Sequence, residues 1–138
     1  MKQEYKQKLL AAYDIINHNL RDLNYPKPTL FFNYRAFKEH VKGHMGMAYM
    51  TRYYSINVPA TGICDASGAI YINPKATAYR YLKRGYSDYL YCLSHELAHH
   101  YYPELEHGSK FEREAAKLFN MILRKHHVAS LSTYTARL

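Results

Sequence analysis

The five residues His95-Glu96-Leu97-Ala98-His99 have the types and the spacing of a metal-dependent hydrolytic site. Residues four apart stand on one face of a helix, so His95 and His99 can present two imidazoles to a single cation. Neutral imidazole is a standard zinc ligand. Glu96 can flank the metal without binding it and take a proton from zinc-activated water. The motif therefore predicts a Zn²⁺ site with Glu96 as the general base.

A catalytic zinc ion usually has three protein ligands and one open position. We expect His107 to be the third ligand, because Pro103 ends the helix of the motif and a short loop can return the chain to the metal. Gly108 permits a close approach at that point. Glu112 and Glu114 on the next predicted helix are rival ligands, and spacing alone does not exclude them.

The other histidines of the chain carry weaker signals, and two surface histidines on a solvated helix would also explain the motif itself. His100 points about 100° around the helix from His99, so we expect it to lie at the surface or to contact a metal ligand and not to bind the metal itself. Gly43 argues against a shared helix for His40 and His44, so we expect both at the surface. The basic pair His126-His127 is favourable at the C-terminus of a helix, so we interpret it as a cap and not as a site.

The periodicity of apolar residues predicts the elements that must position this site. Helices are expected at Glu4–Leu23, Ala76–Arg84, from Ser87 or Asp88 to just before Pro103, and from about Lys110 to His126; strands at Thr29–Phe32, Thr61–Cys64 and Ala69–Ile72, with a turn at Asp65–Gly68. Between them lie a helical turn at Arg35–His40, a bend at Gly43–Gly46 and a mixed segment, Met47–Ser55, with β-favouring tyrosines. This order predicts an α+β fold with a small, mostly antiparallel sheet.

The composition and length of the chain bear on its domain number and its compartment. The 138 residues suit one domain, residues 1–127, followed by a tail at 128–138 that we expect to be loose. No apolar run could span a bilayer, no signal peptide is recognisable, and two isolated cysteines, Cys64 and Cys92, suit a reducing cytoplasm. We therefore expect a cytoplasmic monomer without a membrane partner.

The net charge of +8 and the 16 tyrosines are features that would suit binding of a nucleic acid. Cations and tyrosines alternate in the segment Tyr79–Tyr86 and again in Arg52-Tyr53-Tyr54. Tyrosine rings can stack on unpaired bases while lysine and arginine hold phosphates. An amphipathic helix that buries its tyrosines would show the same pattern. Single-stranded DNA is the polyanionic partner that we expect if the pattern is functional.

The motif followed by His107-Gly108-Ser109-Lys110-Phe111 resembles the SprT-like metalloproteases, the group that includes Spartan. Gly68–Pro74 is similar to the family's strand ahead of the catalytic helix, and Gly46–Tyr49 loosely matches an earlier one. The resemblance covers roughly residues 5 to 125. It implies a minimal zincin fold, zinc on His95, His99 and His107, and a peptidase that acts on DNA-associated proteins.

By the same resemblance, the strand Ala69–Ile72 would be the edge to which an extended peptide substrate adds. The chain departs from the family in lacking a four-cysteine zinc ribbon. The stretch Glu112-Arg113-Glu114-Ala115-Ala116 also resembles the ImmA/IrrE-type metallopeptidases, which would make Glu114 the third ligand and a repressor-like protein the substrate. A zinc-stabilised DNA-binding module without turnover is the alternative from a different class.

Overall fold

The structure, a computed structural model, describes residues 1–55, 60–75 and 85–137, with side chains through residue 126. Within these ranges the chain forms five α-helices, one 3₁₀ turn and three strands. They are α1 (Gln3–Asn19), η1 (Arg21–Leu23), β1 (Thr29–Phe31), α2 (Tyr34–Met45), α3 (Met47–Tyr54), β2 (Gly62–Asp65), β3 (Ala69–Ile72), α4 (Tyr86–Tyr101) and α5 (Ser109–Arg137). The predicted α+β class is confirmed.

The sheet has the order β1-β3-β2, with β1 parallel and β2 antiparallel to β3. It is therefore mixed, whereas we predicted a mostly antiparallel sheet. The helices α2 and α3 lead from β1 to β2, which runs in the opposite direction to β1. The turn between β2 and β3 then reverses the chain again, so β3 runs parallel to β1. The prediction that Ala69–Ile72 is an edge strand is wrong, because β3 is central and β2 is the edge beside α4.

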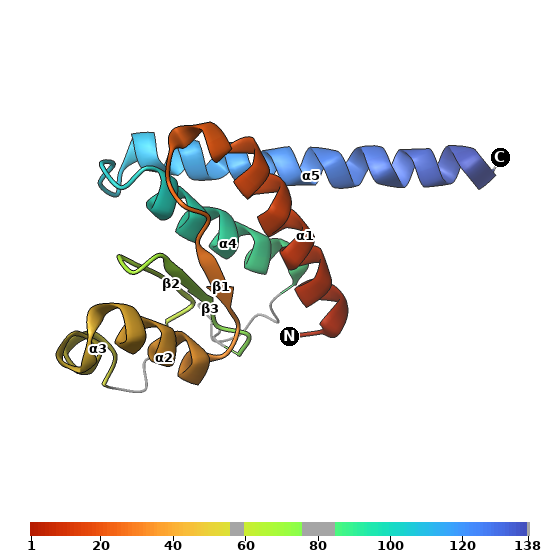
Figure 1. Ribbon diagram of the computed structural model, residues 1–138. Coiled ribbons are helices and arrows are strands. Elements are labelled where there is room, and N and C mark those ends of the chain that lie inside the picture. Colours follow the sequence, from red (N-terminus) through yellow and green to blue (C-terminus); the bar gives the residue numbers. More distant parts are fainter. Residues whose placement is uncertain (56–59, 76–84, 138) are drawn as a thin grey trace.

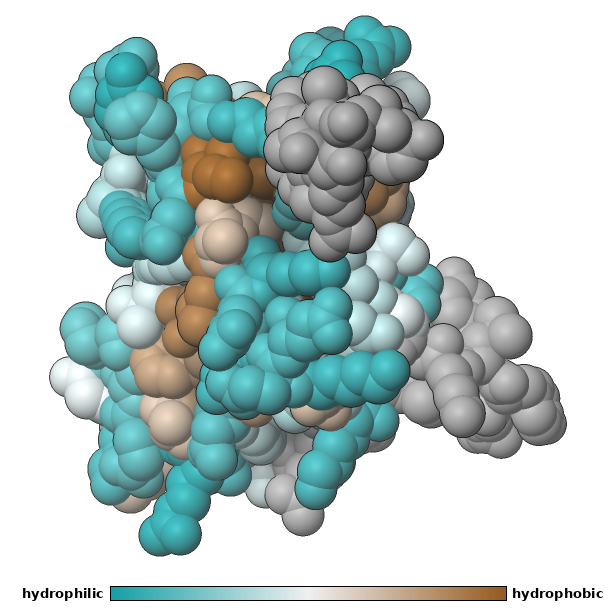
Figure 2. All heavy atoms as spheres, turned by 90° about the vertical axis from the view of Figure 1, so that its right-hand side faces the viewer, coloured by the Kyte–Doolittle hydropathy of each residue, from teal (hydrophilic) through white to brown (hydrophobic). Residues whose placement is uncertain are grey.

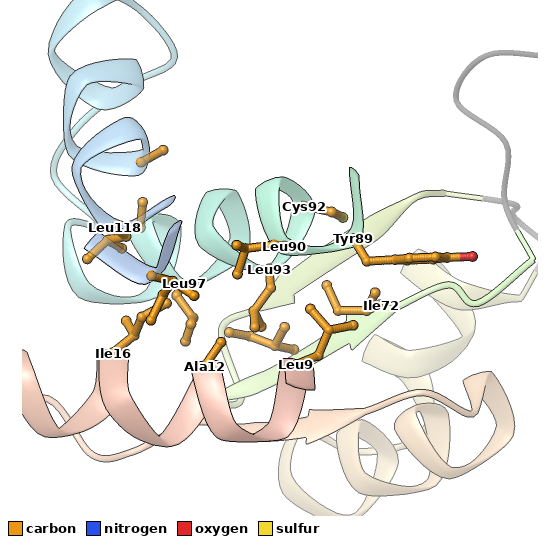
Figure 3. Close-up of a cluster of buried hydrophobic side chains, with 14 of the residues drawn as sticks. Leu9, Ala12, Ile16, Ile72, Tyr89, Leu90, Cys92, Leu93, Leu97 and Leu118 are labelled. Carbon is orange, nitrogen blue, oxygen red and sulfur yellow. The ribbon is translucent and has the colours of Figure 1, made fainter. Parts of the chain in front are cut away.

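Side chains of β3 alternate between two cores, which explains why all four of its residues are buried. Ile70 and Ile72 join the larger core with α1, α4 and α5, and Ala69 and Tyr71 join a smaller one with α2. Figure 1 shows α1, α4 and α5 on one side of the sheet and α2 and α3 on the other. Figure 3 shows α1 and α4 meeting through the labelled residues Leu9, Ala12, Ile16, Leu90, Leu93 and Leu97.

The segment between β1 and β2 is more helical than we predicted. The side chain of Asn33 accepts a hydrogen bond from Ala36 N at 2.9 Å and caps α2, which continues through Gly43. Gly46, with φ +93°, forms the elbow to α3. Tyr49 and Tyr54 of α3 pack against the smaller core, so tertiary contacts override the β preference of these tyrosines.

The ends of the other helices lie closer to the predicted positions. α1 stops ahead of Tyr25-Pro26, as predicted, and Asp88 rather than a residue before the helix caps α4, accepting from Gly85 N at 2.9 Å. α5 continues to Arg137, past the end predicted at His126, and Figure 1 shows it extending beyond the other elements. The helix predicted at Ala76–Arg84 lies outside the described residues. No helix in the described part is long and apolar enough to cross a membrane.

Candidate metal centre

Three histidine side chains converge where the end of α4 meets the start of α5. Nε2 of His99 lies 3.1 Å from Nε2 of His95 and 2.9 Å from Nε2 of His107. The ligand atoms of the three residues all lie within 4.8 Å of one another. Around a tetrahedral zinc ion with bonds of about 2.0–2.1 Å, two ligand nitrogens are separated by about 3.3 Å. The arrangement therefore fits a cation held by these three nitrogens.

Phe111 holds the three rings together from α5. Its side chain is fully buried, and its ring stacks on His99 with centroids 4.1 Å apart. The rings of His95 and His107 contact Phe111 edge-on, at 4.9 and 5.4 Å. The short loop predicted after Pro103 is present: Leu105 N donates to Tyr102 O, and Gly108 O accepts the first α5 bond from Glu112 N. Burial of one aromatic ring thus positions all three imidazoles.

Burial favours the neutral form of His95 and His99, the form in which histidine binds a metal. Burial, together with the neighbouring histidines, lowers the pKa of His99 to about 4. Burial also lowers the pKa of His95, partly opposed by the negative charge of Glu112. A neutral imidazole keeps one ring nitrogen with a free lone pair, so His95 and His99 can each offer a ligand atom to a cation between them.

Glu96 lies beside this cluster on the buried face of α4, with 7% of its surface exposed. Its Oε1 is 4.0 Å from Nε2 of His95. Burial raises the pKa of Glu96 to about 7, and in the described part of the chain no hydrogen-bond donor offsets that burial. A carboxyl group poised near neutral pH beside a cation site can accept and release a proton.

Gly62 of β2 packs directly against Glu96, and sequence reasoning missed it. A Cβ atom at this position would lie 2.6 Å from Cys92 Sγ and 3.0 Å from Glu96 Cγ. A larger residue at this position would therefore crowd the side chains of Cys92 and Glu96, and glycine lets β2 approach α4 this closely. The only signal in the sequence was a glycine at the start of a predicted strand, which by itself indicates no function.

An open cleft of about 760 Å³ runs past the histidines. Glu96, His99 and His107 form one wall, and residues 62–68 of β2 and its turn form the other. Asn73 N donates to Thr61 O, so the backbone of Thr61 points to β3. Because backbone direction alternates along a strand, the N–H and C=O groups of Gly62 and Cys64 point to the free edge of β2.

Cys64 lines the same cleft but is not poised for chemistry. Burial, with the nearby charges of Glu96 and Asp65, raises the pKa of its thiol to about 12. The thiolate, which is the nucleophilic and metal-binding form, is therefore suppressed. Neither Cys64 nor Cys92 forms a disulfide.

The remaining candidates lie outside the three-histidine cluster. Glu114 Oε1 pairs with Lys117 Nζ at 3.1 Å, and Glu112 accepts a hydrogen bond from Tyr91. His100 Nε2 lies 2.7 Å from Pro26 O. His40 and His44 share α2 after all, with ring centroids 4.0 Å apart, because Gly43 is tolerated within that helix.

Of the two segments in which tyrosines and cations alternate, the structure describes Arg52-Tyr53-Tyr54 in full and only the end of the other. Arg52 lies over the ring of its neighbour Tyr53 at 5.4 Å, and Tyr53 is exposed. Most of the segment Tyr79–Tyr86 lies outside the described residues.

Comparisons with protein-family models, with curated proteins and with solved structures find no match for this chain.

Proposed function

We propose that this protein is a zinc-dependent peptidase whose metal ligands are His95, His99 and His107 and whose general base is Glu96. The single observation that carries the proposal is the convergence of three imidazole nitrogens next to a buried carboxyl group whose pKa is about 7. The cleft past this group is open to a substrate. The assignment to a SprT-like type rests on the sequence resemblance alone.

The chain's own residues divide the work of hydrolysis. When bound, zinc supplies a Lewis acid that polarises the substrate carbonyl and makes water nucleophilic near neutral pH. Glu96 takes the proton from the attacking water and delivers it to the leaving amine. The free edge of β2, at Gly62 and Cys64, offers backbone groups that would hold an extended peptide across the cleft. That edge replaces Ala69–Ile72 as the candidate substrate-binding strand.

Hydrolysis of an unfolded, fluorescently labelled protein by the zinc-loaded chain tests the proposal. Glu96→Gln keeps the size of the side chain and removes the base, so we expect zinc binding to persist and the rate to fall by about 10²- to 10⁴-fold. Peptide termini identified by mass spectrometry would establish which bond is broken. Equal rates for the wild type and Glu96→Gln would contradict the proposal.

Two alternatives make different predictions. An ImmA/IrrE-like regulatory peptidase would cut one repressor-like partner and spare an unfolded protein, so capture of a partner by Glu96→Gln would distinguish it. A zinc-stabilised DNA-binding module would bind zinc and DNA and hydrolyse nothing. The pairing of Glu114 with Lys117 gives the ImmA-like ligand set less support than the set with His107.

DNA-associated proteins are the substrate class that we propose from the charge and the resemblance, in a monomer within the reducing cytoplasm. Figure 2 shows hydrophilic side chains beside an apolar band on the face that includes the start of α1. Three lysines at the start of α1 or just before it lie over aromatic rings of the chain: Lys2 over Tyr5, Lys6 over Phe32 and Lys8 over Tyr86. Because lysine and arginine would bind the phosphates, we expect the affinity for single-stranded DNA to fall steeply with salt. No binding at low salt would remove DNA from the proposal.

A further inference from the structure

An exposed hydrogen bond between side chains joins α4 to α5 near the three histidines. The hydroxyl of Tyr91 donates to Oε2 of Glu112 at 2.9 Å. Tyr91 lies four residues, one helical turn, before His95 on α4. Glu112 directly follows Phe111, whose ring contacts all three histidines. The bond therefore fixes a carboxylate at the edge of the cluster, although Glu112 does not belong to the set of converging ligand atoms.

The carboxylate of Glu112 is held near the histidines by its position as well as by its partner. Tyr91 is one helical turn from His95, and Glu112 is next in sequence to the ring that contacts His95, His99 and His107. Glu114, two residues further along α5, faces elsewhere: it pairs with Lys117 and contacts Tyr102. Three neutral imidazoles leave the two positive charges of a zinc ion uncompensated. Glu96 offers one negative charge nearby, and Glu112 offers the other.

We infer that Glu112, held in place by Tyr91, is a positioning residue that strengthens divalent-cation binding at the three histidines through its charge, without ligating the ion. The inference rests on the proposed metal site. Groups around metal ligands commonly contribute about 10- to 100-fold to affinity. Because Glu112 is exposed to solvent, screening places the expected effect at the lower end of that range.

The test is the dissociation constant for zinc, measured by competition with a chromophoric chelator. Glu112→Gln removes the charge, and we expect zinc binding to weaken about tenfold at low ionic strength. Tyr91→Phe keeps the charge but frees the carboxylate, so a smaller loss in the same direction is expected. Glu114→Gln is the matched control, with the same change of charge on the same helix, and it should bind zinc like the wild type.

Salt separates this role from a purely structural one. At about 1 M salt the screening length falls to about 3 Å, so the difference between wild type and Glu112→Gln should shrink. If the hydrogen bond between Tyr91 and Glu112 only joins the two helices, Glu112→Gln should lower the stability of the metal-free protein. The difference in zinc affinity between the wild type and the variant should then persist at high salt. Wild-type affinity in Glu112→Gln, or an equal loss in Glu114→Gln, would overturn the inference. Failure of the wild type to bind zinc would instead overturn the proposed function.

Discussion

Two buried carboxylates on opposite sides of β2 differ in how the fold treats them. Asp65, at the end of β2, accepts hydrogen bonds from the hydroxyls of Tyr49 and Tyr54 at 2.9 and 2.5 Å and from Ser67 N at 2.9 Å. Glu96, on α4, receives no such donors in the described part of the chain and lies beside three histidines whose nitrogens face one another. The polar cluster around Asp65 is complete within the protein, whereas we propose that a cation completes the cluster beside Glu96.

The pKa values follow this difference. Burial alone would raise the pKa of Asp65, but hydrogen bonds from Tyr54, Ser67 and Tyr49 outweigh it and hold the pKa below its usual value. At Glu96 burial acts unopposed and raises the pKa to about 7. A satisfied buried carboxylate stabilises the fold, and an unsatisfied one destabilises it unless it serves a function. The same substitution, carboxylate to amide, should therefore have opposite effects on stability at the two sites.

The largest expected effect is stabilisation of the histidine cluster by zinc. Ligand present at about a thousand times its dissociation constant stabilises a folded protein by about 4 kcal/mol. We expect zinc to raise the thermal midpoint of the wild type in a calorimeter. His99→Ala, which removes the central nitrogen of the cluster, should show no shift. A shift that survives in His99→Ala would place the ion elsewhere.

The second effect concerns Glu96→Gln in the metal-free protein. Because the folded pKa is raised above the unfolded value, ionisation destabilises the fold progressively between about pH 4.5 and pH 7. At pH 8 the amide should therefore stabilise the metal-free protein, by up to about 3 kcal/mol. At pH 4 the effect should vanish. Urea unfolding with a chelator at both pH values measures the difference in the free energy of unfolding. Destabilisation by Glu96→Gln at pH 8 would mean that hydrogen-bond donors satisfy the Glu96 carboxylate.

The opposite result is expected for Asp65→Asn. Its amide nitrogen cannot accept the hydrogen bonds that the carboxylate accepts, so we expect a loss of about 2 kcal/mol at pH 7. The folded pKa of Asp65 is depressed, so its contribution is present above about pH 4 and is lost as the pH falls further. Urea unfolding between pH 7 and pH 3 should show the wild type and variant converging. A constant difference would contradict this assignment.

A smaller effect tests the contact between β2 and α4. Gly62→Ala places a methyl group 2.6 Å from Cys92 Sγ, and overpacking of this kind costs about 1–3 kcal/mol. In a Cys92→Ala background the sulfur is absent, so the same substitution should cost less. A double-mutant cycle in urea measures the coupling. Strict additivity would mean that the two residues do not crowd one another.

The smallest effect is expected at an exposed ion pair. Asp14 Oδ1 lies 3.1 Å from Lys27 Nζ, and both side chains are more than half exposed. Asp14→Asn should change stability by less than about 0.5 kcal/mol in the same assay. This variant sets the background against which the carboxylates Asp65 and Glu96 are compared. A loss as large as that of Asp65→Asn would mean that removal of any acid destabilises this basic protein.

The sequence predicted the local features of the site and missed its long-range ones. The helical spacing of His95 and His99 and the short loop to His107 are local, and the structure brings these three residues together. The order of the strands depends on how a crossover closes, so the central place of β3 could not be read from alternation alone. Gly62 and Asp65 acquire their roles only through contacts with α4 and α3, which no sequence period encodes.

The zinc content of the purified protein tests the central claim most directly. Elemental analysis of the wild type, His107→Ala and Glu114→Ala should give about one zinc ion per chain in the wild type and Glu114→Ala, and a strongly reduced content in His107→Ala. Loss of zinc in Glu114→Ala alone would favour the ImmA-like ligand set. A wild type that contains no zinc and takes none up when zinc is added would contradict the proposed metal centre.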